Sequence, residues 1–258
     1  MSISVKNISF SYRDNEVLKG ISFDAEAGEF ISVLGPNGVG KSTLFKCILK
    51  LLEPNSGEIY IDGNPIMDMK PADIAKQIAY IPQYNSPAFN FSVLEMVLMG
   101  TTAQIGRFEV PKEKQLNAAK DAIAKLGITH LQDRGYANIS GGERQLTLIA
   151  RAIAQQAKIL VMDEPSASLD FGNKIRLMKT IKGLAKMGYI IIQSTHDPEQ
   201  AYFYSDKILA MHDGKVIAFG KPSEVVDDKL ISTLYNLDVD VVPVKCGVVS
   251  CVPRDLEK

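Results

Sequence analysis

Phe30-Ile-Ser-Val-Leu-Gly-Pro-Asn-Gly-Val-Gly-Lys-Ser-Thr43 is the stretch that decides the fold. Its apolar first part, residues 30–34, has the length and composition of a buried strand. Gly35 to Thr43 then matches the pattern G-x-x-x-x-G-K-[ST], in which glycines let backbone N–H groups wrap phosphates. In this pattern Lys41 reaches the terminal phosphates, Ser42 binds Mg²⁺, and the helix that begins near Lys41 adds its positive end. The stretch therefore predicts nucleotide binding.

A second glycine-rich turn, Ile139-Ser-Gly-Gly-Glu-Arg-Gln145, stands far along the chain from the first. Ser140 and Glu143 have the S-x-x-E spacing of a capping box, which satisfies free N–H groups at a helix start. A cap does not require two consecutive glycines, each of which costs about 1 kcal/mol in a helix interior, whereas close approach by an anion favours them. Phosphate contact therefore accounts better for Gly141 and Gly142, and the two turns suggest a divided nucleotide site.

Two carboxylates end the apolar run Ile159-Leu-Val-Met-Asp-Glu164. Acid groups at the carboxyl end of a strand lie where ligands bind in sheets of this kind. We expect Asp163 to hold Mg²⁺ through water and Glu164 to act as the general base that polarises the attacking water. Taken alone, the pair is also compatible with a solvated acidic strand end.

Three single side chains complete the candidate set. Gln83 follows an expected strand at Ile78–Ile81, and His196 follows another at Tyr189–Ser194, so each lies just past a strand end. Taken alone, Gln83 carries no specific signal, and His196 is also typical of a structural, hydrogen-bonding histidine. Tyr12 either stacks on an adenine face or covers the sheet.

The composition of the 258-residue chain argues against several classes of protein. A net charge of -1 and a pI of about 6.3 argue against a basic face that would bind nucleic acid. The apolar runs have core-strand length, whereas a membrane span needs about 20 apolar residues, and the N-terminus lacks a secretory signal, so we expect a cytoplasmic protein. Three cysteines make no disulfide framework: Cys47 is expected in the core, and Cys246 and Cys251 are not expected to bind metal.

The order of elements predicts an α/β fold with an inserted helical part. Strands are expected at Ile3–Phe10, Gly20–Ala25, Phe30–Leu34 and Glu58–Asp62, with a helix from Ser42. Residues from about 84 to 157 look helical, with helices at Ser92–Gly100, Pro111–Leu126 and Gly142–Gln156. Strands and helices then alternate, which implies a largely parallel sheet, up to a hairpin at Asp213-Gly214. The tail from about Ser223 predicts two short helices and strands at Val239–Val244 and Val248–Val252.

Together and in this order, these motifs resemble the ATP-binding subunits of ABC transporters over nearly the whole chain. The resemblance implies a P-loop NTPase (RecA-like) core with a mostly parallel sheet, an N-terminal antiparallel β subdomain and an inserted α-helical subdomain. It implies a single domain over residues 1–258. The core then covers about 1–83 and 158–222, the helical subdomain about 84–157, and a C-terminal extension about 223–258.

The resemblance also assigns roles to residues. ATP contacts are implied for the adenine-stacking aromatic and the Walker A loop, which are Tyr12, Gly35, Pro36, Asn37, Gly38, Val39, Gly40, Lys41, Ser42 and Thr43. Mg²⁺ is implied at Ser42, Gln83 and Asp163, and catalysis is implied for Lys41, Gln83, Glu164 and His196. In the family, the signature motif of one subunit completes the site of its twin. ATP contacts in trans are therefore implied for Ser140, Gly141, Gly142, Glu143 and the D-loop residue Asp170.

By the same resemblance the chain is a peripheral protein at the cytoplasmic face of the cell membrane. It implies an ATP-driven head-to-tail homodimer that works with transmembrane permease subunits and, indirectly, with an extracytoplasmic substrate-binding protein. Residues 91–100, 105–108, 141–145 and 148–155 look like the ATPases of iron-siderophore, haem and cobalamin importers. Ile139, Leu146 and Thr147 depart from the usual signature but leave the catalytic set intact.

Two other functions share the same ATP motifs. One is a zinc or manganese importer ATPase, and the other is a soluble ABC-type ATPase of iron-sulfur cluster assembly. The segment Tyr84 to Gly106 discriminates between transport and the soluble function, because it borders the groove where a membrane subunit binds in such ATPases. Its aromatic and Met residues, Phe89, Phe91 and Met99, either line that groove or pack in the core.

Overall fold

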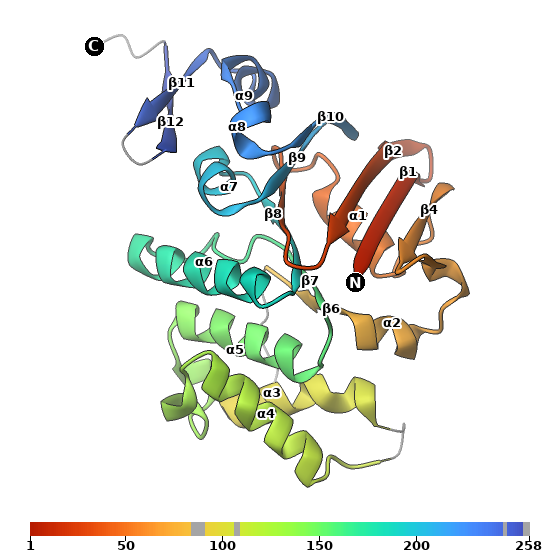
Figure 1. Cartoon of the computed structure of the whole chain (residues 1–258), viewed down its shortest axis with the longest axis vertical. Helices are drawn as coiled ribbons and strands as arrows, with labels where there is room; N and C mark the ends of the chain where they lie inside the picture. Colours follow the sequence, from red (N-terminus) through yellow and green to blue (C-terminus); the bar gives the residue numbers. More distant parts are fainter. Residues whose placement is uncertain (84–90, 106–108, 245–246, 255–258) are drawn as a thin grey trace. The chain divides into compact units, whose positions relative to one another are not determined.

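The computed structural model describes residues 1–83, 91–105, 109–244 and 247–254 (Figure 1). The chain forms two compact units, which are Met1–Met69 with Leu184–Lys258, and Lys70–Gly183. No helix among the described residues combines the length and the apolar character that a membrane span needs. The predicted division into core, helical subdomain and C-terminal extension stays a prediction, as do the expectations for Phe89, Cys246 and residues 106–108, which lie outside the described residues.

The first unit contains an antiparallel sheet with the strand order β2-β1-β4-β5. Its strands are β1 (Ser2–Tyr12), β2 (Asn15–Glu26), β4 (Ser56–Ile61) and the short β5 (Asn64–Pro65). In β1 the buried positions change phase, from Ile3 and Val5 to Ile8 and Phe10. The change falls at a register shift where Asn7 has a φ of 51°, because one extra residue turns the following side chains to the other face. The predicted antiparallel β subdomain is confirmed.

A second sheet runs through the first unit in the order β10-β9-β3-β8. Its strands are β3 (Phe30–Leu34), β8 (Ile190–Thr195), β9 (Lys207–His212) and β10 (Lys215–Gly220). β3 is parallel to both neighbours and all five of its residues are buried, as expected for a strand covered on both faces. The helices α1 (Lys41–Ile48) and α7 (Pro198–Tyr204) follow β3 and β8 along the chain. The predicted parallel core and the hairpin at Asp213-Gly214 are confirmed.

The second unit is mostly helical. It contains α2 (Pro71–Gln77), β6 (Ile78–Ile81), α3 (Val93–Leu98), η2 (Met99–Gln104), α4 (Glu113–Lys125), η3 (Thr129–Leu131), η4 (Tyr136–Asn138), α5 (Gly141–Ala154), β7 (Ile159–Met162) and most of α6 (Phe171–Lys186). β6 and β7 pair in parallel, and α3, α4 and α5 pack on one another. The three predicted helices are therefore present, whereas the sequence pattern did not predict α2.

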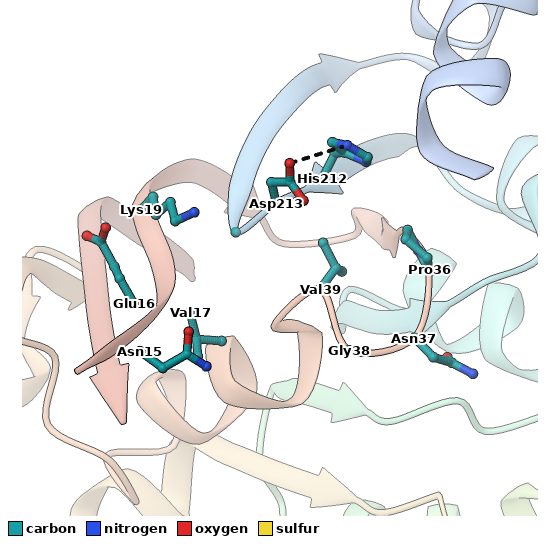
Figure 2. Close-up of a pocket in the computed structure, with 11 residues that line it drawn as sticks. Asn15, Glu16, Val17, Lys19, Pro36, Asn37, Gly38, Val39, His212 and Asp213 are labelled. Atoms are coloured by element: carbon teal, nitrogen blue, oxygen red, sulfur yellow. Dashed lines mark ion pairs between the residues drawn. The ribbon is translucent and has the colours of Figure 1, made fainter. Parts of the chain in front are cut away.

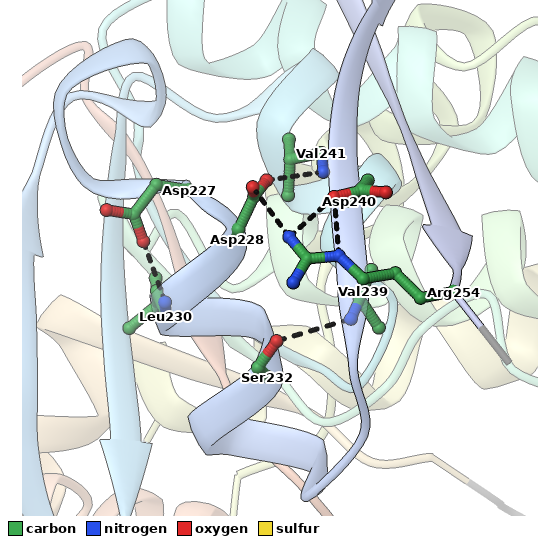
Figure 3. A network of polar contacts seen from close by, with 8 residues as sticks. All are labelled: Asp227, Asp228, Leu230, Ser232, Val239, Asp240, Val241 and Arg254. Atoms are coloured by element: carbon green, nitrogen blue, oxygen red, sulfur yellow. Dashed lines mark hydrogen bonds and ion pairs between the residues drawn. The ribbon is translucent and has the colours of Figure 1, made fainter.

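The C-terminal segment belongs to the first unit and packs on its strands β3 and β9. Its elements are α8 (Pro222–Val225), α9 (Asp228–Tyr235), β11 (Val239–Val244) and β12 (Val248–Pro253), which confirms two short helices and two strands. The strands β11 and β12 form an antiparallel hairpin, and Figure 3 shows how Arg254 connects it to α9. Arg254 donates from Nε to Asp240 (2.7 Å) and forms an ion pair with Asp228 of α9 (3.3 Å). The same Asp228 carboxylate accepts the backbone N–H of Val241 at 2.6 Å. Leu230, Leu234 and other apolar residues of α9 join the buried cluster around β3 and β9.

Candidate functional site

The loop after β3 owes its shape to its glycines. Gly40 is the N-cap of α1 with a φ of 107°, and Gly38 has a φ of 85°. A Cβ at Gly40 would lie 3.0 Å from Leu18 Cδ2 and 3.1 Å from the carbonyl oxygen of Val17, and one at Gly35 would lie 2.5 Å from the carbonyl oxygen of Met211. Both the backbone conformation and the close packing against β2 and β9 therefore require glycine.

Lys41 begins α1 and turns back into the loop. Its side chain is buried, with Nζ donating to the carbonyl oxygens of Gly35 (2.7 Å) and Pro36 (3.0 Å). These carbonyls satisfy an ammonium group that burial would otherwise penalise. Because the first turn of α1 contains no acidic residue, nothing there opposes the positive end of the helix dipole. The loop thus holds a buried cation at the positive end of a helix, an arrangement that suits phosphate oxygens.

A cavity of about 360 Å³ lies beside this loop, between the start of β2 and the β9–β10 turn (Figure 2). Its lining includes the apolar side chains of Val17 and Val39. The other lining residues come from the start of β2, the loop and the β9–β10 turn, and they are Asn15, Glu16, Lys19, Pro36, Asn37, Gly38, His212, Asp213 and Gly214. The volume is within the usual range for small-molecule sites. Tyr12 does not line this cavity: its half-exposed ring packs edge-on against Phe10, with centroids 4.8 Å apart.

His196 lies next to the loop because β8 is a neighbour of β3. Leu34 and Thr195 are register partners, and the N–H of Gly35 donates to the carbonyl oxygen of Thr195 at 3.3 Å. His196 therefore follows directly the residue that holds the first loop glycine. Its own carbonyl accepts a hydrogen bond from the hydroxyl of Tyr235 on α9, at 2.7 Å. No sequence signal pointed to Tyr235, which holds the His196 backbone from the C-terminal segment.

The second unit brings Gln83, Asp163 and Glu164 to one edge of its strand pair. Ile81 and Met162 are register partners, and the N–H of Asp163 donates to the carbonyl oxygen of Ile81 at 2.9 Å. Because both strands run in the same direction, the residues that follow them leave the pair side by side. Glu164 has a φ of 43°, in the left-handed region that a glutamate seldom adopts, and such strained residues are enriched at functional sites.

Tyr80 is a contact of Asp163 that the sequence did not reveal. Its hydroxyl lies 3.4 Å from Asp163 Oδ2. Burial, and then the charge and hydrogen bond of Asp163, raise the pKa of Tyr80 to about 12, so the hydroxyl keeps its proton and acts as the donor. The ring lines a cavity of about 200 Å³ with Pro82, Leu148, Arg151, Ala152 and Gln155. Strand periodicity gives no sign of such a pairing, because it does not identify the residue across the strand pair.

The turn before α5 contains the predicted capping box. Ser140 Oγ accepts the N–H of Glu143, and Glu143 Oε2 accepts both the N–H (2.8 Å) and the hydroxyl (2.7 Å) of Ser140. The hydrogen bond from the Ser140 side chain, and then the one from its backbone N–H, lower the pKa of Glu143. Asp170 stands close by at the start of α6, where it accepts two hydrogen bonds from Asn173, and these lower the pKa of Asp170.

Each unit thus gathers part of the predicted set. The first holds the loop, Lys41 and His196, and the second holds Gln83, Asp163 and Glu164 at one strand edge. The second also holds the Ser140 to Glu143 turn beside the residues that follow Asp170. Hydroxyl, amide and carboxylate oxygens from Ser42, Gln83 and Asp163 are donors that suit Mg²⁺, which binds one or two carboxylates and substrate phosphates and keeps several waters.

Comparison with known proteins agrees with this chemistry. Residues 18–167 match the family described as ABC transporter. An ABC transporter ATP-binding protein of Haemophilus influenzae is 43% identical over 92% of this chain and 88% of its own. A hemin import ATP-binding protein of Thermobifida fusca (93% and 84% covered) and a molybdate import ATP-binding protein of Haemophilus influenzae (92% and 88%) are each 33% identical. A solved metal-chelate type ABC transporter in an inward-facing conformation shows 31% identity and a TM-score of 0.86, with 98% and 97% covered.

Proposed function

The chain belongs to the ABC transporter family, whose ATP-binding proteins are ATPases coupled to transport, and we propose that two copies of the chain share their ATP sites and power an importer. ATP closes a head-to-tail homodimer, and hydrolysis reopens it. This motion drives the uptake of an iron-siderophore, haem or cobalamin-type substrate through separate membrane subunits. The loop Gly35 to Thr43 around the buried Lys41 is the observation that carries the proposal.

The first unit binds most of the nucleotide in this proposal. Backbone N–H groups of the loop surround the phosphates, and Lys41 exchanges its carbonyl partners for phosphate oxygens. The cavity between the start of β2 and the β9–β10 turn accepts the ribose and base. Tyr12 lies on β1, outside the residues that line this cavity, and is the aromatic that stacks on the adenine in this proposal. His196, which directly follows the register partner of Leu34, contacts the terminal phosphate.

The second unit supplies the groups that act on the attacking water. Asp163 and Gln83, with Ser42, would hold Mg²⁺, which would neutralise charge on the phosphate oxygens. Glu164 takes the proton of the water as general base. The left-handed backbone at Glu164 supports this role, because such strain persists where the surrounding structure fixes a functional side chain.

The turn Ser140 to Glu143 and Asp170 complete the site of the second copy. In one copy the hydroxyl of Ser140 donates to Glu143, so the cap is satisfied without a nucleotide. When the dimer closes, the terminal phosphate on the other copy takes the place of Glu143 as acceptor for this hydroxyl, and the N–H groups of Gly141 and Gly142 face the same phosphate. The two glycine-rich turns of one chain thus serve two different ATP molecules.

The partners and cargo follow from relatives. The hemin import relative and the metal-chelate type transporter support import through permease subunits. An extracytoplasmic binding protein and a peripheral position at the cytoplasmic face of the membrane are part of the same proposal. The molybdate import relative supports an oxyanion as a second candidate cargo. Zinc or manganese import and a soluble role in iron-sulfur cluster assembly share the ATP chemistry. Co-purification with a multi-spanning membrane subunit favours transport, whereas a soluble partner favours the assembly role.

Replacing Glu164 by glutamine tests the catalytic assignment. The amide keeps the size of the side chain but cannot take a proton, so ATP hydrolysis should fall by about 100-fold or more. ATP-bound dimers should accumulate, which size-exclusion chromatography with light scattering measures. Glu199→Gln serves as a control for the loss of one carboxylate. Glu199 accepts hydrogen bonds from Ser250 and Cys251 of the C-terminal hairpin and has no role in the proposed catalysis. Hydrolysis at the parent rate by the Glu164 variant would falsify the assignment.

A further inference from the structure

The two glycines that open α5 have different neighbours. A Cβ at Gly141 would lie 3.5 Å from Leu169 Cδ2, which is an ordinary contact. A Cβ at Gly142 would lie 3.2 Å from Asn173 Cγ and 3.4 Å from both its Cβ and its Oδ1, which is tighter than normal packing. Neither glycine has a positive φ, so the backbone conformation does not require glycine at either position. Crowding at Gly142 is therefore a separate reason for a glycine there.

Asn173 is not free to make room for a side chain at Gly142. Its Nδ2 donates to Asp170 Oδ2 at 2.7 Å, and its backbone N–H donates to Asp170 Oδ1 at 2.9 Å. Its Oδ1 accepts from Arg176 Nη1 at 3.3 Å. Both ends of the amide are thus engaged, one of them with a carboxylate, the stronger kind of hydrogen bond. A rotation of the amide away from Gly142 breaks these bonds.

We propose that Asn173 is a positioning residue that fixes the Asp170 carboxylate and at the same time confines Gly142, so that the Ser140 to Glu143 turn and the Asp170 loop move as one piece. The proposal rests on the proposed function, because only in the proposed dimer do both segments reach the ATP of the second copy. It also changes the explanation of the glycine pair. Phosphate approach explains both glycines equally, whereas the packing singles out Gly142 through Asn173.

A thermal cycle tests the packing without any nucleotide. Alanine normally stabilises a helical position relative to glycine, so Gly141→Ala should leave the melting temperature unchanged or raise it. Gly142→Ala should lower it by about 2 to 4 °C. In an Asn173→Ala background the same Gly142→Ala change should no longer lower it, because Cγ and Oδ1 are gone. Equal shifts for Gly142→Ala in both backgrounds, or a rise like that of Gly141→Ala, would overturn the proposal.

ATP turnover tests the positioning role. Asn173→Asp keeps the shape of the side chain but loses the amide donor and places a second carboxylate against Asp170. We expect kcat to fall about tenfold with the KM for ATP within about twofold, because the loop that binds ATP is untouched. If the hydrogen bonds between Asn173 and Asp170 only stabilise the start of α6, Asn173→Asp would lower the melting temperature. It would then show no loss of kcat at a temperature where the variant is folded. A parent-like kcat for Asn173→Asp would therefore remove Asn173 from this role.

The same assay couples the two positions. Gly142→Ala should lower kcat at least about tenfold in the parent and less than about threefold in the Asn173→Ala background. A loss by the same factor in both backgrounds would mean that phosphate approach alone requires Gly142, and the proposal would be wrong. If the parent itself hydrolyses no ATP, the proposed function fails, while the thermal cycle still decides whether Asn173 confines Gly142.

Discussion

Replacement of Gly40 by alanine tests how the phosphate loop is held in shape. The new methyl group would lie 3.0 Å from Leu18 Cδ2 and 3.1 Å from the carbonyl oxygen of Val17, both on β2. It would also place a side chain on a residue with a φ of 107°. The change therefore combines steric crowding with backbone strain, and either effect displaces the loop from the conformation that surrounds Lys41.

The two effects have different sizes and can be separated with Gly38. A left-handed backbone costs a residue with a side chain about 1 to 2 kcal/mol, and overpacking costs about 1 to 3 kcal/mol more. We therefore expect Gly40→Ala to lower the free energy of unfolding by about 2 to 5 kcal/mol. Gly38 has a φ of 85°, but a Cβ there meets nothing within 4 Å, so Gly38→Ala should cost only about 1 to 2 kcal/mol.

Urea unfolding of the parent and both variants measures these differences, and titration with ATP reports the effect on the loop. Gly40→Ala should have the larger loss of unfolding free energy and should bind ATP more weakly, because a loop pushed away from β2 cannot surround the phosphates. Gly38→Ala should lose less stability. Equal losses of unfolding free energy in the two variants would mean that close packing between the loop and β2 does not shape the site.

Three further substitutions have expected outcomes. Tyr80→Phe should raise the Mg²⁺ concentration for half-maximal ATP hydrolysis about tenfold by removing the donor to Asp163, with nucleotide binding in EDTA unchanged. Tyr235→Phe should lower the free energy of unfolding in urea by about 1 kcal/mol, since His196 loses a hydrogen bond. The pKa of Glu143 is lowered in the folded chain, so its charge stabilises the cap above the ordinary carboxyl pKa. The stability difference between the parent and Glu143→Gln should therefore be present at neutral pH and vanish as the pH falls through that lowered pKa.

Features that follow local rules could be predicted from the sequence. The strand Phe30–Leu34 and the helix after the loop were visible because an apolar run, a glycine pattern and helical spacing follow one another directly. The cap formed by Ser140 and Glu143 was visible for the same reason, since its two residues are three positions apart. The short α2 was not predicted, although Pro71 occupies a first-turn position that suits proline.

Contacts between distant segments could not be predicted. The hydrogen bond from Tyr235 to His196 joins residues 39 positions apart, and that from Tyr80 to Asp163 joins residues 83 positions apart. Periodicity shows which face of an element is buried but not which residue it meets. The crowding of Gly142 was hidden for a related reason. A pair of glycines looks the same in a sequence whether a ligand or a neighbouring side chain requires it.

In the proposed mechanism, each ATP site contains residues from two copies of the chain. Lys41→Ala and Ser140→Arg should each abolish hydrolysis, one in the loop and the other in the signature turn. In a head-to-tail dimer of the two variants, one site combines both defects and the other site is intact, so an equal mixture should recover up to about one quarter of the parent activity. The mixture must form ATP-dependent dimers, which light scattering detects. If such a mixture recovers no activity, all residues of one ATP site come from one copy, which would contradict the proposed mechanism.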